Sequence, residues 1–357
     1  MRIWEEEVRG GYPPMYSLTL SGLERMLAFT QGRAPRPPVH HLTGLTPVEA
    51  SPGTSTFTMP STGWLNSPTG IFQPGVLAFL ADAPLGTALM TGLPAGEVTT
   101  TSDLTMSYLR PAGIESGLLT GKAKTIHLGR NLGLAEITIT DEGGKVLAHG
   151  TTRCFILRFP VPDGLEPPQE DLPSYEDDPY QRDVVGDVLP QEVWNSLTGL
   201  EIMLGFINGE LPPPPIHYLT GMHPTSASEG EAEFVIPATR WLTSPASTIY
   251  GGSIALLADA ALSSAVQTTV PAATAFAPLD LKVNYLRPAF ADDKDLVARA
   301  HVTHRGKRLA VAEAELTNAE GKTVAIATGS SLIMPGRSWS GSPLVAADEA
   351  TAEDTGQ

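Results

Sequence analysis

Two aspartates in apolar surroundings are the residues of this chain best suited to acid–base or nucleophilic chemistry. Asp82 lies seven residues after Gly75, and Asp259 lies seven residues after Gly252, with almost only apolar residues between them. A carboxylate can act as a general base or as a nucleophile. The free N–H groups at the start of a helix, aided by the helix dipole, can stabilise a developing oxyanion. Each stretch therefore holds a potential base or nucleophile and a potential oxyanion donor.

The length of a helix decides how these parts combine. Gly251 and Asp259 are eight residues apart, which corresponds to about 12 Å at a rise of 1.5 Å per residue. One helix therefore cannot place its own first amide and its own aspartate around the same carbonyl group. Two antiparallel helices can, because the aspartate of each then lies near the start of the other.

The two helices come from a duplication of the whole sequence. An offset of 177 residues relates one copy to the other without an insertion or deletion between the matched motifs. This period is too long for a solenoid, whose units have roughly 20–50 residues, so it indicates two tandem domains. The offset joins Gly22-Leu23-Glu24 to Gly199-Leu200-Glu201, Trp64-Leu65 to Trp241-Leu242, and Tyr108-Leu109-Arg110-Pro111 to Tyr285-Leu286-Arg287-Pro288.

Composition divides the chain into four parts. We expect a first repeat with its N-terminal helix over residues 1–158 and a second repeat over residues 185–337. Residues 159–184 are rich in proline and in acidic residues, which predicts an extended linker. Residues 338–357 are acidic and poor in large apolar residues, which predicts a disordered tail.

Within each copy, the hydrophobic pattern predicts one long helix and an antiparallel sheet. A helical stretch opens each copy, over 17–29 or 192–206, and the long helix runs from near Gly75 to Met90 or from near Gly252 to Val266. Because the long helix is apolar on nearly every side, a sheet should wrap it. The predicted fold class is α+β, a double hotdog: two tandem repeats, each with a long central helix wrapped by antiparallel sheet, form an intramolecular pseudo-dimer. The predicted strands are 54–59, 103–108, 117–127, 132–141 and 146–157 in the first copy, and 232–236, 280–285, 296–304, 309–318 and 323–334 in the second.

Charge and composition exclude several classes of protein. The net charge of −16 argues against nucleic acid as a partner. No apolar run approaches the ~18 residues of a membrane span, and the acidic N-terminus does not resemble a signal peptide, so we expect a cytoplasmic protein without a membrane partner. The single cysteine, Cys154, is expected to be an inert buried thiol. His40 and His217 have no ligand-spaced partners, so no metal site is expected.

The helix and strand motifs resemble those of hotdog-fold acyl-CoA thioesterases of the phenylacetate-degradation (PaaI-like) group. That group has His-Gly-Gly, six residues and an acid, followed by a strand ending in Tyr-x-x-Pro. The second copy has Tyr250-Gly251-Gly252 followed by Asp259, and the first has Gln73-Pro74-Gly75 followed by Asp82. The resemblance covers roughly residues 38–157 and 215–334 and implies hydrolysis of acyl-CoA thioesters. It also implies that acid and amide come from opposite repeats, and that coenzyme A enters as part of the substrate, with no other cofactor.

This pairing predicts two unequal sites. The first combines Asp82 with the amide of Gly251 and with Thr101, at the position where many relatives carry a hydroxyl beside the acid. The second combines Asp259 with Pro74, which has no N–H to donate, and with Pro278 at the hydroxyl position. We expect the second site to be weakened rather than dead, because Gly75 could offer its amide. Pro84, two residues after Asp82, is expected to kink the first helix and so to re-aim its acid.

Further candidates surround these sites. Thr243, for the first site, and Asn66, for the weaker second site, lie near where relatives position a water or carbonyl, although a shift of one residue would substitute Ser244 or Ser67, and a turn-forming role competes. The motif residues Tyr250, Gly252, Gln73 and Gly75 are candidates for substrate binding. Basic side chains near strand ends could contact the phosphates of coenzyme A, against the alternative of a solvated turn: Arg305, Lys307, Arg308 and Arg130.

The sequence leaves two other functions open. A hotdog enoyl-CoA hydratase or dehydratase would use a histidine with its acid, and no histidine lies at either helix start or within five residues after Asp82 or Asp259. A non-catalytic acyl-CoA-binding pseudo-enzyme would have lost both sites, and hydrolysis of any thioester distinguishes it. Neither the acyl group nor the pairing of whole chains into a homodimer is readable from the residues.

Overall fold

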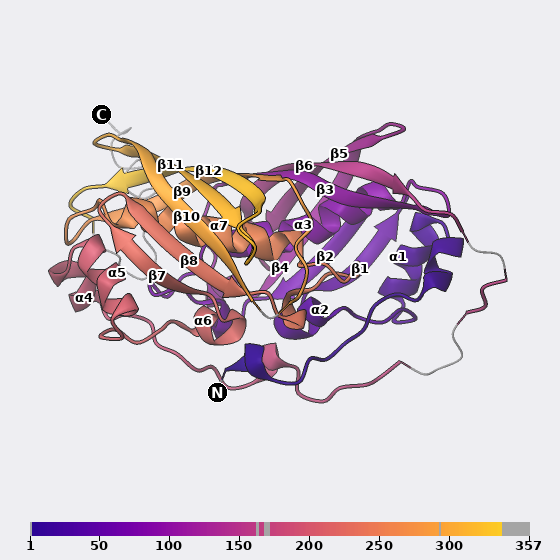
Figure 1. The fold of residues 1–357 in the computed structure, drawn as a ribbon, viewed down its shortest axis with the longest axis horizontal. Helices are drawn as coiled ribbons and strands as arrows, with labels where there is room; N and C mark the ends of the chain where they lie inside the picture. The colour runs from indigo at the N-terminus through magenta and orange to yellow at the C-terminus, as the bar shows by residue number, and fades with distance from the viewer. Residues whose placement is uncertain (1, 162–163, 168–171, 293, 338–357) are drawn as a thin grey trace.

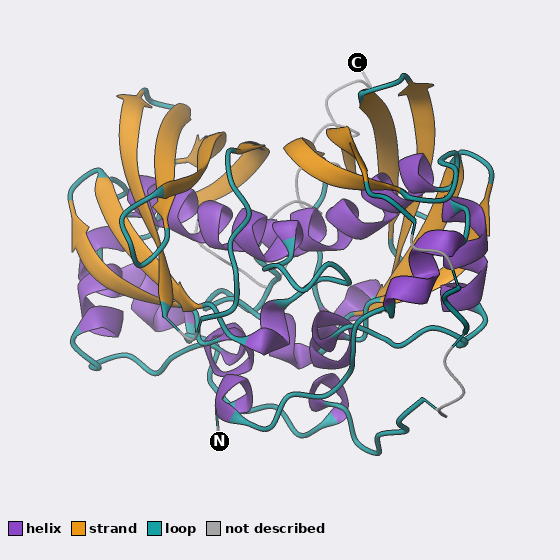
Figure 2. Cartoon of the chain, turned by 45° about the vertical axis from the view of Figure 1, so that its right-hand side comes forward, coloured by secondary structure: helices purple, strands orange, loops and turns teal. Residues whose placement is uncertain are grey.

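A computed structural model describes residues 2–161, 164–167, 172–292 and 294–337. The two copies form two similar halves, coloured indigo to magenta and orange to yellow in Figure 1, which meet at the middle of one continuous sheet. In Figure 2 the strands of each half curve over a long helix, and shorter helices cover the opposite side. The architecture is the predicted double hotdog.

The first half holds three α-helices and six strands within the described residues. Its long helix is α3 (Gly75–Met90), and 16 consecutive residues continue through Pro84. The other elements are α1 (Gly22–Thr30), α2 (Pro38–Thr43), β1 (Thr46–Ser51), β2 (Thr54–Pro60), β3 (Glu97–Tyr108), β4 (Leu118–Leu128), β5 (Leu132–Thr140) and β6 (Val146–Arg158).

The second half repeats this order with one further helix among its described residues. Its long helix is α7 (Gly251–Gln267). The other elements are α4 (Gln191–Ser196), α5 (Gly199–Ile207), α6 (Pro215–Thr220), β7 (His223–Ser228), β8 (Glu231–Pro237), β9 (Ala275–Tyr285), β10 (Asp295–Arg305), β11 (Leu309–Thr317) and β12 (Thr323–Met334).

The halves join by strand pairing across a pseudo-twofold axis. The order of the twelve-stranded sheet is β1-β2-β4-β5-β6-β3-β9-β12-β11-β10-β8-β7. At its centre β3 pairs antiparallel with β9, and Thr105 lies opposite Lys282. These two residues are equivalent under the 177-residue offset, so the axis passes between them. The pairing confirms the expected pseudo-dimer within one chain.

Helices α3 and α7 pack side by side beneath this junction because glycines open the contact. A Cβ on Gly252 would lie 2.7 Å from the Phe79 carbonyl oxygen, and a Cβ on its equivalent Gly75 would lie 3.0 Å from the Leu256 Cα. Only glycine allows backbones to approach this closely. The helices are antiparallel, since the start of each meets the middle of the other.

Two local predictions were wrong. The opening helix of each copy is broken, because Ser21 and Thr198 cap α1 and α5 with capping boxes and start new helices there. The edge strands β1 and β7 were missed, since Pro47 and Pro224 make these segments resemble turns. A proline is tolerated on an edge strand because its missing N–H leaves no ladder bond unmade inside the sheet.

The segments before each copy cross to the opposite half. The Trp241 Nε1–H donates to the Glu6 carbonyl at 3.1 Å, and the Trp64 Nε1–H donates to the Arg182 carbonyl at 3.0 Å. Glu6 and Arg182 pair with each other at 2.7 Å. The last part of the expected linker therefore packs against the protein rather than extending freely. The tail predicted over 338–357 lies outside the described residues.

Candidate functional site

The carboxylate of Asp82 is held by groups from both copies. Its Oδ2 accepts the backbone N–H of Gly252 at the start of α7, at 3.1 Å, and its Oδ1 accepts the Thr101 hydroxyl of β3, at 2.9 Å. Asp82 is 7% exposed, so the bonds fix its orientation in a largely dry site. The structure brings Asp82, Thr101 and the start of α7 together as expected, with Gly252 rather than Gly251 bonded to the acid.

Gly251 stands next to the acid with its amide unused. Within the described part of the chain, no group accepts the Gly251 N–H, which belongs to the first turn of α7. A Cβ at this position would lie 2.7 Å from the Asp82 Oδ2, so the glycine leaves room for the acid in its observed position. The Tyr285 hydroxyl donates to the Gly251 carbonyl at 2.9 Å and anchors the turn. The anchoring role of Tyr285, visible in sequence only as the start of Tyr-x-x-Pro, was missed.

The equivalent acid, Asp259, keeps only part of this arrangement. Its Oδ2 accepts the backbone N–H of Gly75 at 2.9 Å, in the same way that Asp82 accepts from Gly252. Pro74 occupies the position of Gly251 and Pro278 that of Thr101, so neither offers a donor. Asp259 is 2% exposed. Gly75, proposed as a replacement oxyanion donor, is therefore already used by the acid.

Burial changes the acidity of both carboxyl groups. Burial raises the pKa of Asp82 to about 6, against opposing effects of the Thr101 hydroxyl and the Gly252 amide. Burial also raises the pKa of Asp259 to about 6, against opposing hydrogen bonds from Gly75 and Gln73. An acid with a pKa near 6 can take up a proton and return it near neutral pH, which suits a general base.

Tyr250 and Pro84 both alter the backbone hydrogen bonds of α3 near Asp82. The proline ring removes one backbone donor and crowds the preceding turn. The Tyr250 hydroxyl lies at this weak point: it donates to the Phe79 carbonyl at 2.7 Å and accepts the Ala83 N–H at 2.8 Å. A regular helix would pair those two backbone groups with each other. The hydroxyl of Tyr250 is thus engaged in holding α3 beside Asp82.

Gln73 makes the matching contact in the other half. Its side-chain amide donates to the Leu256 carbonyl at 3.3 Å, and Leu256 is the equivalent of Phe79 under the repeat. Gln73 and Tyr250 therefore both tie a helix start to the facing helix.

The two loop candidates, Thr243 and Asn66, differ in whether the side chain is free to hold a water or a substrate group. The Thr243 hydroxyl is fully buried, donates to the Arg240 carbonyl at 2.6 Å and pairs with the Tyr12 hydroxyl at 2.8 Å. Thr243 is therefore committed to holding its loop against the N-terminal segment. The Asn66 Oδ1 is buried and has no hydrogen-bond partner among the described residues, so it remains a candidate for holding a water or a substrate group.

The basic candidates divide between the two sites. Arg305 donates through its Nε to the Thr269 hydroxyl at 2.9 Å, just beyond the end of α7. This end lies about 25 Å along the helix axis from Gly251, so Arg305, Lys307 and Arg308 lie on the Asp259 side. Arg130, on the β4–β5 turn, lies near the end of α3 and on the Asp82 side, since the neighbouring Leu128 contacts Gly92. In the described ranges none of the four forms an ion pair.

Cys154, His40 and His217 show no catalytic features. Burial raises the pKa of Cys154 to about 12, and a protonated thiol is a poor nucleophile. Burial and His223 lower the pKa of His217 to about 3, and burial holds the pKa of His40 well below its usual range. In residues 2–337, apart from the gaps given above, no three His, Cys, Asp or Glu side chains gather as metal ligands. No described helix is long and apolar enough to cross a membrane.

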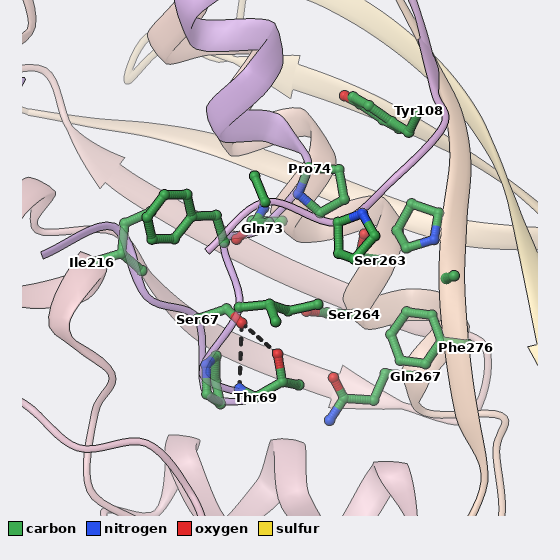
Figure 3. Close-up of a pocket in the computed structure, with 18 of the residues that line it drawn as sticks. Ser67, Thr69, Gln73, Pro74, Tyr108, Ile216, Ser263, Ser264, Gln267 and Phe276 are labelled. Atoms are coloured by element: carbon green, nitrogen blue, oxygen red, sulfur yellow. Dashed lines mark hydrogen bonds between the residues drawn. The ribbon is translucent and has the colours of Figure 1, made fainter. Parts of the chain in front are cut away.

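A cavity of about 220 Å³ lies on the Asp259 side and was not foreseen from the sequence. Figure 3 shows Gln73, Pro74 and Tyr108 on one side of it and Gln267 and Phe276 on another. Its other walls include Trp194, Phe206 and Ile216 from α4, α5 and α6. This cavity therefore lies on the side of the acid that has no free oxyanion donor. Space alone cannot stabilise an oxyanion, so the side with a free helix N–H is the better candidate for catalysis.

Comparison with known proteins agrees with this architecture. Residues 70–148 and 246–325 each match the thioesterase superfamily. The acyl-coenzyme A thioesterase PaaI of Escherichia coli is 35% identical over 111 residues, which are 31% of this chain and 76% of that protein. The solved tesB protein of Mycobacterium avium subspecies paratuberculosis superposes with a TM-score of 0.52 at 13% identity, covering 88% of this chain and all of that one. A hotdog-fold protein of unknown function from Alicyclobacillus acidocaldarius gives 0.51 at 15% identity, covering 83% of this chain and 97% of that one.

The fold, the duplicated sequence match and the PaaI relative define an enzyme of the hotdog thioesterase class. With the duplicated sequence match and the PaaI relative, the chain belongs to the thioesterase superfamily, as a tandem double-hotdog member.

Proposed function

We propose that this chain hydrolyses acyl-CoA thioesters at the site formed by Asp82, Thr101 and the start of α7. One observation carries the proposal: the N–H of Gly251, which has no partner among the described residues, lies beside a buried carboxylate whose two oxygens are already oriented by Gly252 and Thr101. A base and an oxyanion donor thus converge from opposite repeats. The PaaI relative supports the substrate class, since it acts on acyl-coenzyme A.

The chemistry needs one water molecule and no further reactant. The Asp82 carboxylate accepts a proton from water, and the water oxygen forms a bond to the thioester carbonyl carbon. The oxyanion that develops accepts a hydrogen bond from the Gly251 N–H. In a dry site this bond stabilises the oxyanion more than it would in water. The carbon–sulfur bond then breaks, and the coenzyme A thiolate takes the proton from Asp82. Direct attack by Asp82 would give an anhydride that water opens, and the same residues would serve it.

The surroundings of Asp82 suit this role. Thr101 donates to one carboxylate oxygen and so favours the ionised form, opposing the effect of burial. Gly251 is partly exposed, whereas Asp82 is buried, so a thioester can reach the amide beside a base that is shielded from bulk solvent. Arg130 lies on the exposed turn at the corresponding end of α3 and is the candidate contact for the phosphates of coenzyme A.

Release of free thiol from acyl-CoAs tests the proposal. Purified protein is mixed with short, medium, long and aryl acyl-CoAs, and a thiol reagent follows coenzyme A. We expect turnover of at least one class above the rate without enzyme. Crotonyl-CoA serves as a second substrate, because hydration of its double bond would be seen as loss of ultraviolet absorbance without thiol release. Hydration alone, or no reaction with any acyl-CoA, would contradict the proposal.

A further inference from the structure

The cavity on the Asp259 side has the size and lining of a site for an apolar group. Its volume is about 220 Å³, and both copies contribute to its walls. A dry apolar cavity of roughly 150 Å³ can hold benzene, so this space is large enough for an aromatic ring or a medium alkyl chain. Leu77, Phe234, Ala260 and Phe276 are among the residues that form the apolar surface.

Two buried donors in the cavity wall have no partner. The Tyr108 hydroxyl and the Gln267 Nε2 make no hydrogen bond to any described residue, and both residues line the cavity. The equivalent of Tyr108 is Tyr285, which donates to the Gly251 carbonyl. A buried donor without a partner lowers stability, because it has lost its hydrogen bonds to water without replacement. Both donor atoms are covered in this structure, so a ligand with an apolar chain and a carbonyl oxygen would satisfy one of them after the Tyr108 or Gln267 side chain turns toward the space.

The same side lacks the groups that hydrolysis requires. Pro74 has no N–H where Gly251 has one, and Pro278 has no hydroxyl where Thr101 has one. Asp259 does not line the cavity and is bonded to Gly75. A thioester bound there would find space and donors but no oriented base with an oxyanion donor beside it.

A basic turn adjoins the cavity wall. Arg308 precedes Leu309, which pairs across the sheet with Leu332 of the wall. Arg305 bonds to Thr269, two residues after Gln267. The exposed side chains of Arg305, Lys307 and Arg308 place positive charge where the phosphates of a coenzyme A ester could bind.

We infer that this cavity is a second, non-hydrolytic site for an acyl or aryl thioester of coenzyme A. The inference rests on the proposed function only in assigning hydrolysis to the Asp82 side. The duplicated chain then binds two thioesters and cleaves one. Free carboxylates share the apolar chain and the carbonyl oxygen, but they lack the phosphates that the basic turn would hold.

Calorimetry with an uncleavable ligand tests the inference independently of hydrolysis. The probe is 2-oxooctyl-coenzyme A, in which a methylene group separates sulfur from the carbonyl, so that no thioester bond exists. We expect two equivalents bound per wild-type chain, and weaker binding of octanoate. Ala277→Phe fills the cavity wall and should leave one equivalent, with thioester hydrolysis retained. The matched control is Thr328→Phe, at an exposed position of β12 that does not line the cavity, which should still bind two equivalents.

A second variant protects the test if Ala277→Phe does not fold. Gln267→Leu removes one donor and should weaken one of the two binding steps about tenfold for the ketone probe. It should leave binding of S-octyl-coenzyme A, which has no carbonyl, unchanged. Binding of only one equivalent by the wild type would overturn the inference. So would the loss of both hydrolysis and one binding equivalent in Ala277→Phe. Two equivalents without any thioester hydrolysis would instead support the inference and reject the proposed function.

Discussion

The two composite sites share their fold-forming contacts and differ in the groups that do chemistry. In both, a buried aspartate accepts the amide of a glycine at the helix crossing, Gly252 for Asp82 and Gly75 for Asp259. Only the Asp82 side adds a free amide and a hydroxyl. In a symmetric dimer, both sites would carry the same residues, and the groups that join the halves could not be told apart from the groups that do chemistry. The duplication separates them: the glycines at the helix crossing and the two acids join the halves, and the residues around them decide the chemistry.

This separation explains why Asp259 is present on the side that has no free oxyanion donor. A buried carboxylate without hydrogen bonds would be strongly destabilising, but Asp259 satisfies the Gly75 amide at the start of α3. A helix start has N–H groups that need an acceptor. Asp259 therefore has a structural role that does not depend on catalysis. Matched substitutions of Asp82 and Asp259 test whether the two acids differ in this way.

The largest effect is expected from Asp82→Asn. The change keeps the size of the side chain but removes the base or nucleophile, which should lower kcat by about 10²–10⁴-fold or more. The matched control is Asp259→Asn, which should change kcat by less than about threefold. Thiol release measured for both variants in parallel gives the ratio. A greater loss in Asp259→Asn would show that the cavity side performs the reaction.

The second effect is the pH dependence of hydrolysis. The pKa of Asp82 is raised to about 6, so the ionised base predominates above that pH and is lost below it. We expect kcat/KM to fall about tenfold for each pH unit below 6, which is roughly 100-fold at pH 4. A rate profile over pH 4–9, with circular dichroism showing that the protein stays folded, measures the midpoint. A flat profile between pH 4 and 7 would exclude Asp82 as the base.

A smaller effect is expected from Thr101→Val. The hydroxyl donates to the Asp82 Oδ1 at 2.9 Å, and its loss should both disorient the acid and raise the acid's pKa further. We expect a decrease of about tenfold in kcat at pH 7 and an upward shift of the acid limb of the pH profile. Thr100→Val, on the neighbouring exposed residue, is the control. A reduced rate with an unshifted acid limb would mean that Thr101 acts on the substrate and not through Asp82.

The sequence predicted the repeat, the central helices and the donor asymmetry, because each depends on residue types at fixed spacing. Proline lacks an N–H wherever it lies, so Pro74 and Pro278 could be interpreted without coordinates. The position of the cavity could not be predicted, since it depends on how Trp194 and Phe276, far apart in the chain, pack around it. The role of Tyr250 was also hidden: its hydroxyl inserts between the Phe79 carbonyl and the Ala83 N–H of α3, a contact that no spacing in the sequence indicates.

The smallest effect on activity and a distinct effect on stability are expected from Asp259→Asn. Burial raises the pKa of Asp259 from about 3.8 to about 6, so the folded state favours the protonated acid. The unfavourable burial of the charge is therefore absent below pH 3.8, grows between pH 3.8 and 6, and is complete above pH 6. At about 1.4 kcal/mol per pKa unit, burial of the charge lowers the stability of the wild type by up to about 3 kcal/mol.

Asparagine carries no charge and can still accept the Gly75 N–H, so the Asp259→Asn variant should be more stable than wild type at pH 8 and equally stable at pH 4. Denaturant unfolding at both pH values measures the difference, and a variant that is less stable at pH 8 would show that the ionised carboxylate is needed to hold the start of α3.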